Sequence, residues 1–290
     1  MIPVPSISTL KSFRKWSDRA FLWREALRSL DCVRGRKRIL FSPWPEIEAS
    51  LRHGFRYSRH EVTFAPVVPG ECGYDLIVPC SIEALAVAAA DDALRRRNPL
   101  RVPDPAVVQL CDDKAALNSR LRELGFGLHI PARARPGEFP YLLKLRRDAC
   151  ARNTFLLTGP DDEAAYADRL HSPNYLRQAC VRGEIEYTTH LLMAGRRLRR
   201  HLTVSFWMER DCAIKGRDPV RLHRRCRARA ADLALFESML AAIGFEGLCC
   251  VNYKLSEGVP MLFEINPRLG FSLGPFFSTF LRSLEWHRAA

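Results

Sequence analysis

Several signals of common protein classes are missing from this 290-residue chain. No apolar run approaches the ~20 residues needed to cross a bilayer, because the longest, from Ile82 to Ala90, is interrupted by Glu83. The N-terminus shows no charged region followed by an apolar one, as a secretory signal would. There is no internal repeat and no low-complexity linker. We therefore expect a soluble, cytoplasmic protein without a membrane span.

Cysteine and glycine motifs are also absent. The ten cysteines are scattered and include no Cys-x-x-Cys pair, which argues against a zinc site. A chain of this length does not need disulfides to fold, so we expect most cysteines to be buried small hydrophobic residues or unpaired thiols. No Gly-x-Gly-x-x-Gly follows the first predicted strand, so we do not expect a dinucleotide site there.

The net charge of +13 is the unusual bulk property. It points to anionic partners such as nucleic acid, an acidic membrane surface or nucleoside triphosphates, although arginine-rich GC-rich coding explains it equally well. No nucleic-acid recognition motif is present, so we do not expect that partner. Basic residues between positions 190 and 230 suggest an acidic substrate or carrier peptide, or else a solvated basic face. They are Arg196, Arg197, Arg199, Arg200, His201, Arg217, Arg221, His223, Arg224 and Arg225.

The first part of the chain alternates strands with helices. Strands are predicted over residues 38–41 and 74–79, a helix over 83–97, and a further short apolar segment covers 106–110. This order favours a doubly wound parallel sheet. Before it, residues 9–30 have helical apolar spacing with a basic face. That helix is expected to pack on the domain or on a second subunit, which leaves a homodimer open, and a membrane-surface helix is the less favoured alternative.

The remainder reads as mixed α+β structure. A helix is predicted from Lys114 to about residue 124, with Asp112 or Asp113 as N-cap and Gly125 as C-cap. An antiparallel pair turns at positions 194–195, and a final hairpin turns at 256–258. The other predicted elements are strands 140–145, 154–158, 175–181, 186–193, 198–207, 248–255 and 260–265, and helices 163–170 and 229–243.

The end of the last strand carries a candidate metal site. Strand alternation places Glu264 and Asn266 on one face, about 7 Å apart along the chain, while Phe263 and Ile265 point into the core. Two oxygen ligands on one face suit a hard cation that also binds phosphates, which describes Mg²⁺, with Mn²⁺ as an alternative. A polar strand end with a proline stop is the competing interpretation.

The neighbouring strand offers a third ligand. Asn252 lies opposite Glu264 if the hairpin has a three-residue loop or one bulge, whereas a plain two-residue turn would place it on the wrong face. After the strand, Arg268 places guanidinium donors where phosphate charge would lie.

Residues 262–272 resemble the C-terminal signature of the ATP-grasp ligases. Four further segments resemble that family in the same order: 113–114, 140–144, 177–181 and 183–188. The resemblance covers about residues 111–275, with a compatible α/β subdomain before it. It implies an N-terminal helical extension (1–35), an α/β subdomain (36–110), a central lobe (111–182) and a C-terminal lobe with the metal site (183–290).

The resemblance also implies roles for individual residues. Lys114 and Lys144 would contact the α- and β-phosphates. Gln178, Cys180 and Val181 belong to the hinge whose backbone holds the adenine. Glu186 would accept from the ribose hydroxyls, with Glu184 as its rival. Glu264, Asn266 and Asn252 would hold Mg²⁺, and Arg268 would stabilise the transferred phosphoryl group. Lys215 would contact the γ-phosphate, unless it is a solvated loop lysine.

The chemistry implied is activation of a small-molecule carboxylate as an acyl phosphate, which an amine then displaces in a biosynthetic, ADP-forming reaction. The chain departs from the family in the loop 145–154, which contains no glycine. Its arginines, Arg152 among them, would grip phosphate through side chains, or else turnover is slow. A non-catalytic ATP-binding regulatory protein is therefore the alternative. Asn252 and His190 also stand where acidic residues are usual.

Overall fold

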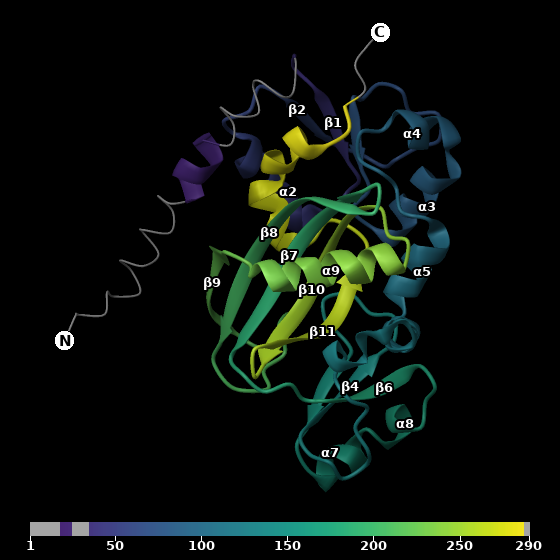
Figure 1. Cartoon of the computed structure of the whole chain (residues 1–290), viewed down its shortest axis with the longest axis vertical. Coiled ribbons are helices and arrows are strands. Elements are labelled where there is room, and N and C mark those ends of the chain that lie inside the picture. Colours follow the sequence, from purple (N-terminus) through teal and green to yellow (C-terminus); the bar gives the residue numbers. More distant parts are fainter. Residues whose placement is uncertain (1–17, 25–34, 287–290) are drawn as a thin grey trace, which may run out of the picture. The chain divides into compact units, whose positions relative to one another are not determined.

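The computed structural model describes residues 18–24 and 35–286. The described residues divide into two compact units: those up to Val102 together with those from Leu269 onward, and Pro103–Arg268 (Figure 1). Of the helix predicted over residues 9–30, the described residues 18–24 are helical, and the rest lies outside the described residues. None of the helices in the described ranges combines the length and apolar character that crossing a bilayer requires.

The first unit contains a three-stranded parallel sheet in the order β2-β1-β3. Its strands are β1 (Arg38–Phe41), β2 (Glu61–Phe64) and β3 (Leu76–Val78). The central strand β1 is buried at three consecutive positions, as parallel strands covered on both faces are. The strands predicted over 38–41 and 74–79 are therefore confirmed, whereas β2 escaped prediction. The helices of this unit are α2 (Pro45–Phe55), α3 (Ile82–Ala90), α4 (Asp92–Arg97) and the 3₁₀ helix η3 (Phe271–Ser283).

The single helix predicted over residues 83–97 is wrong in one respect. Asp91 leaves the helical region at φ −99° and ψ 99°, and its side chain caps the second helix by accepting from the N–H of Leu94. In η3, Phe276, Phe277 and Phe280 are buried and Phe271 is 56% exposed. Close approach of α2 to η3 requires glycine, because a Cβ on Gly54 would lie 2.7 Å from a carbonyl oxygen of η3.

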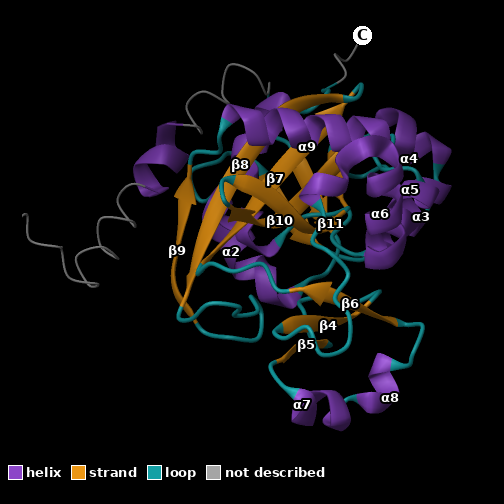
Figure 2. Ribbon diagram, turned by 60° about the horizontal axis from the view of Figure 1, so that its bottom comes forward, coloured by secondary structure: helices purple, strands orange, loops and turns teal. Residues whose placement is uncertain are grey.

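The second unit contains two antiparallel sheets (Figure 2). Helix α9 (Ala230–Ala242) covers one face of the five-stranded sheet, and Phe236, Met239 and Leu240 enter its core. The five strands, in sheet order, are β11 (Val259–Asn266), β10 (Gly247–Ser256), β7 (Ile185–Ala194), β8 (Arg197–Met208) and β9 (Val220–Cys226). The three-stranded sheet has the order β5 (Thr154–Leu157), β4 (Tyr141–Leu145) and β6 (Tyr175–Ala179), with α7 (Pro160–Ala165) and α8 (Ala167–Leu170).

Two helices lead into this unit. The apolar segment 106–110 is helical, within α5 (Pro105–Asp112), whose first turn is capped by Asp104. Helix α6 (Lys114–Leu121) begins as predicted, because the carboxylate of Asp113 accepts from two of its free N–H groups. Gly125 takes the left-handed conformation expected of a C-cap, at φ 88°, inside the π-helical turn η1 (Arg122–Phe126). The 3₁₀ turn η2 (Gly127–His129) follows.

The hairpin of β10 and β11 tests the predicted register. Its turn has two residues, Glu257 and Gly258, both with positive φ, as a type I′ turn requires. A bulge beside Asn252 then restores the pairing of Asn252 with Glu264. The predicted register is therefore confirmed by way of the bulge. The extra residue is Phe263, so the prediction that Phe263 points into the core is wrong.

Candidate active site

Alternate residues of three adjacent strands project from the face of the five-stranded sheet opposite α9. Directly paired residues point to the same face, and the pairing is Asn252 with both Thr188 and Glu264. The neighbouring pairs continue this polar row in both directions. Its members are Glu186, Thr188 and His190 of β7, Cys250, Asn252 and Lys254 of β10, and Glu264 and Asn266 of β11.

Glu264 lies at the centre of the row. Oε1 accepts from the amide groups of Asn252 at 2.6 Å and Asn266 at 3.0 Å, and Oε2 lies 3.4 Å from Nζ of Lys114. Burial by itself would raise the pKa of this carboxyl. The charge of Lys114 and the two amide hydrogen bonds have the larger, opposite effect and lower the pKa to about 2. Glu264 is therefore ionised at neutral pH.

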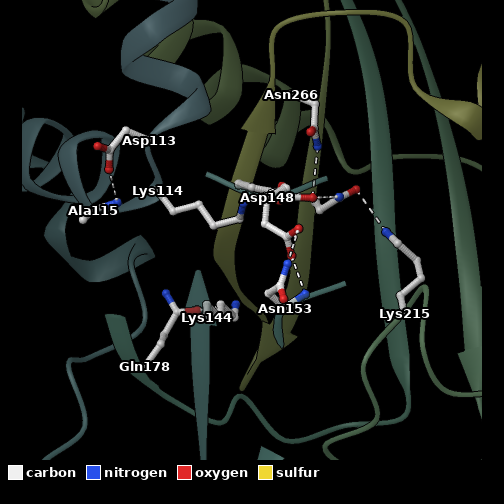
Figure 3. Close-up of polar contacts among 11 residues, drawn as sticks. Asp113, Lys114, Ala115, Lys144, Asp148, Asn153, Gln178, Lys215 and Asn266 are labelled. Carbon is white, nitrogen blue, oxygen red and sulfur yellow. Dashed lines mark hydrogen bonds and ion pairs between the residues drawn. The ribbon is translucent and has the colours of Figure 1, made fainter. Parts of the chain in front are cut away.

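Lys114 approaches from the first residue of α6. Its Nζ donates to the backbone carbonyl of Asp148 at 2.9 Å (Figure 3). The helix start is fixed from outside, because Arg146 donates to both oxygens of the capping carboxylate of Asp113 at 3.0 and 2.6 Å. This bidentate ion pair fixes the start of α6 and thereby holds Lys114 beside the β4–β5 loop.

Lys144 enters from β4 and is 7% exposed. Its Nζ donates to Oε1 of Gln178 at 2.5 Å and lies 4.8 Å from the ring centre of Phe263. Burial lowers the pKa of Lys144 to about 8, against the opposing effect of nearby carboxylates. The bulge therefore turns Phe263 toward Lys144, a placement that strict strand alternation does not reveal.

Lys215 reaches the same group from the loop between β8 and β9. Its Nζ lies 2.6 Å from Oε1 of Glu186, 2.8 Å from Oγ1 of Thr188 and 3.0 Å from Oδ1 of Asn252. Figure 3 shows Lys114 and Lys215 pointing toward this group from opposite sides. Of the two interpretations of Lys215, the structure therefore favours a site residue over a solvated loop lysine.

The oxygen donors of this group fit a hard divalent cation that shares its coordination with phosphates. Glu264 supplies one carboxylate, and a half-turn of the Asn252 or Asn266 amide directs an oxygen to the same place. Two lysine ammonium groups already lie against these oxygens, so the position favours positive charge. Among the described residues, no group of three or more His, Cys, Asp and Glu side chains that could hold a metal ion is found, so a cation held here would need the amide oxygens beside Glu264.

The glycine-free loop adopts a backbone that normally favours glycine. Cys150 and Ala151 have φ of 59° and 55°, in the left-handed region. Asp148 stabilises the loop by accepting from the backbone and side-chain nitrogens of Asn153 at 2.8 and 3.3 Å. The loop thus forms the turns that glycine would permit, at a cost in backbone strain.

The loop that carries Lys215 touches the glycine-free loop. A Cβ on Gly216 would lie 2.8 Å from the carbonyl oxygen of Cys150, and Arg217 donates to the carbonyl of Thr154. Both loops therefore border the same group of polar side chains.

The segment after β6 is tied to the five-stranded sheet. Lys254 is 2% exposed, and its Nζ donates to the carbonyl oxygens of Gly183 at 2.7 Å and Val181 at 3.4 Å. Cys180 forms a disulfide with Cys212, an exception to the expectation of free thiols. Lys254 was missed from the sequence, although a lysine between the apolar residues of a buried strand is itself a signal.

Some predicted residues lie outside the central group. Arg152 is exposed in the β4–β5 loop, and Glu184 is exposed and 3.6 Å from Arg221. Glu186, its rival, lies inside the central group. Arg268 acts on the central group electrostatically, because its charge lowers the pKa of Cys250, which burial raises.

Comparisons by structure identify the fold. A D-alanine–D-alanine ligase from Bacillus anthracis matches with a TM-score of 0.56 at 11% identity, over 85% of this chain and 97% of that chain. An L-amino acid ligase from Bacillus licheniformis gives 0.58 at 13% identity, over 84% and 70%. A phosphoribosylamine–glycine ligase from Thermotoga maritima gives 0.60 at 15% identity, over 84% and 72%.

These three proteins are ATP-grasp enzymes, and the chain has the ATP-grasp fold. The predicted fold class, a parallel-sheet subdomain followed by two α+β lobes, is confirmed. No protein-family model matches the sequence, and no curated protein matches it by sequence. At identities of 11–15% the likeness establishes the fold alone.

Proposed function

We propose that this protein is an ATP- and Mg²⁺-dependent, ADP-forming ligase that joins a carboxylate to an amine. The observation that carries the proposal is the convergence of Lys114, Lys144 and Lys215 on a face that holds Glu264, Glu186 and two amides. Three cations beside two carboxylates suit a triphosphate with its metal, because catalysis of phosphoryl transfer is mainly positioning and charge neutralisation.

The nucleotide would lie between the β4 sheet and the β10–β11 hairpin. Lys114 and Lys144 would neutralise the α- and β-phosphates, and Lys215 would move from Glu186 to the γ-phosphate. Phe263 would pack against the adenine, since its ring already lies beside Lys144. The backbone of Cys180 and Val181 would hold the adenine edge, fixed in place by Lys254. The Bacillus anthracis ligase of the same fold has been solved with ATP.

Glu264, Asn266 and Asn252 would hold the Mg²⁺, which would neutralise phosphate charge when bound. Glu186 is the better candidate for the ribose hydroxyls than Glu184, because it lies inside the central group and becomes free to accept once Lys215 moves to phosphate. Arg268 would stabilise the acyl phosphate formed from the substrate carboxylate.

The test is ADP release measured against a panel of carboxylates, each with and without amines. Release that requires both an acid and an amine, and that falls at least about a hundredfold in Glu264→Gln, supports the ligase. A drop of that size corresponds to about 2.7 kcal/mol of lost transition-state stabilisation. ATP binding without release against every pair would instead indicate a regulatory ATP-binding protein, and unchanged release by Glu264→Gln would refute the metal assignment.

A further inference from the structure

A second concave site lies in the Pro103–Arg268 unit, beside the proposed nucleotide cleft. It has a volume of about 460 Å³ and lies among α6, the 131–133 segment, the 170–173 loop and β6. That volume is within the range of small-molecule sites. Of the residues proposed to contact ATP, Gln178 alone lines it, and Lys114, Lys144, Lys215 and Phe263 do not. The pocket is therefore separate from the cleft, with Gln178 as the shared wall.

The pocket wall is strongly basic. Four arginines line it, and none of its lining residues is acidic. Arg146 is compensated by Asp113, and Arg177 acts on Glu163, whose pKa it helps to lower. Arg122 donates to the carbonyl oxygen of Pro131, and Arg133 makes no hydrogen bond or ion pair with another described residue. Two guanidinium charges thus lack an acidic partner in this part of the described chain.

Asn118 adds a polar group to the wall. Its side chain belongs to α6, and its amide is not among the buried unpartnered polar atoms of the described ranges, although it hydrogen-bonds to no other described residue. The amide is therefore accessible from the pocket, where it can hydrogen-bond to water or to a ligand. It supplements the arginines with a neutral donor and acceptor.

We propose that this pocket is a ligand site for a small molecule that carries a phosphate group. A phosphate monoester has a charge of about −1.5 to −2 at neutral pH, which matches the two uncompensated guanidinium groups. Arg122 comes from the junction of α6 and η1 and Arg133 from the 131–133 segment, so two separate segments each contribute a guanidinium group to the wall. The remaining volume accommodates the organic part of the ligand.

Occupancy of the pocket bears on both cleft lysines. Gln178 lines the pocket and accepts from Nζ of Lys144, so a ligand that touches Gln178 changes the setting of that ammonium group (Figure 3). Arg146 lines the pocket and holds the carboxylate of Asp113, which caps the helix that presents Lys114. We therefore expect coupling between this pocket and the nucleotide; that coupling rests on the proposed ATP site, whereas the pocket itself does not.

The direct test uses phenyl phosphate as the probe and benzoate as its carboxylate counterpart, titrated calorimetrically at about 150 mM salt, where unspecific surface attraction is screened. Wild-type protein is expected to bind phenyl phosphate at least about tenfold more tightly than benzoate, because the dianion matches two guanidinium charges. The double variant Arg122→Ala/Arg133→Ala is expected to lose at least about tenfold in affinity, or about 1.4 kcal/mol.

A control variant locates the probe. Arg227→Ala removes an exposed positive charge outside the pocket and should bind like wild type. Equal binding by the double variant and wild type, equal loss in Arg227→Ala, or equal affinity for benzoate would each overturn the proposal. Thermal unfolding of each variant checks that it is folded.

The coupling is tested by titrating AMP-PNP with Mg²⁺ in the presence and absence of saturating phenyl phosphate. A change of at least about threefold in AMP-PNP affinity in wild type, absent from the double variant, supports coupling. An unchanged affinity refutes it. Failure of AMP-PNP to bind at all would refute the ATP site and leave the pocket to stand on the direct titration.

Discussion

Replacing Lys144 by methionine is expected to stabilise the free protein while removing nucleotide binding. The ammonium group is buried, and its pKa of about 8 lies below the ordinary 10.5. That difference corresponds to about 3 kcal/mol by which folding disfavours the charged form. Methionine fills similar volume without charge, so a gain of about 1–3 kcal/mol at pH 7 is expected after the loss of the Gln178 hydrogen bond.

The pH dependence gives this prediction its sign. Below pH 8 the lysine is charged in both folded and unfolded chains, and wild type bears the whole penalty. Between pH 8 and 10.5 the folded chain releases its proton first, so wild type regains about 1.4 kcal/mol per pH unit relative to Lys144→Met. The measurement is urea unfolding of both proteins at pH 7 and pH 9.5, with Arg227→Met as the control for loss of an exposed cation.

A Lys144→Met protein that is less stable than wild type at pH 7, with the same difference in unfolding free energy at pH 9.5, would refute the penalty assigned to the buried charge. The second half of the prediction concerns binding, because a neutral side chain cannot neutralise phosphate. AMP-PNP affinity should fall at least about thirtyfold, since a buried charge-assisted contact contributes about 2–3 kcal/mol. A variant both stabler and fully able to bind would show that Lys144 lies outside the nucleotide site.

Three further changes test the loops and the hinge. Ala151→Gly should raise the unfolding free energy by up to about 1 kcal/mol in thermal unfolding, because its left-handed φ costs roughly 1–2 kcal/mol and the entropy of glycine offsets part; a lower melting temperature would contradict this. Gly216→Ala should lower the free energy of unfolding by about 1–3 kcal/mol in urea, since the added Cβ would lie 2.8 Å from the Cys150 carbonyl oxygen and φ is +96°. An unchanged free energy would mean that the β4–β5 and β8–β9 loops can separate at no cost. Lys254→Met should lower the free energy of unfolding by about 1–3 kcal/mol and weaken AMP-PNP binding in calorimetric titrations, because two backbone carbonyls lose their donor. Unchanged AMP-PNP binding would show that the segment after β6 does not contact the nucleotide.

Local patterns predicted much of this fold because they act through neighbouring residues. The cap of α6 by Asp113 and the left-handed Gly125 depend on residues adjacent in the chain, and both are confirmed. The helix at residues 106–110 was open to the same reasoning, since Asp104 and Pro105 form an N-cap followed by proline. Strand β9 had no such signal, because an edge strand of exposed arginines and histidine shows no apolar alternation.

The site shows where sequence patterns stop. Asn252 opposite Glu264 was predicted conditionally, and a bulge fulfils the condition. The same bulge turns Phe263 toward Lys144, which alternation cannot foresee because it assumes an unbroken period of two. The contacts of Lys215 depend on the path of the β8–β9 loop, set by contacts with another loop distant in sequence.

The central claim is that the cleft binds ATP through Mg²⁺ held by Glu264 and neighbouring amides. Its most direct test is a titration of AMP-PNP with and without Mg²⁺, on wild type and on Glu264→Gln. We predict binding that tightens at least about tenfold with Mg²⁺ in wild type, equivalent to about 1.4 kcal/mol, and no such gain in the variant. Binding that is absent, or that responds equally to Mg²⁺ in both proteins, would contradict the claim.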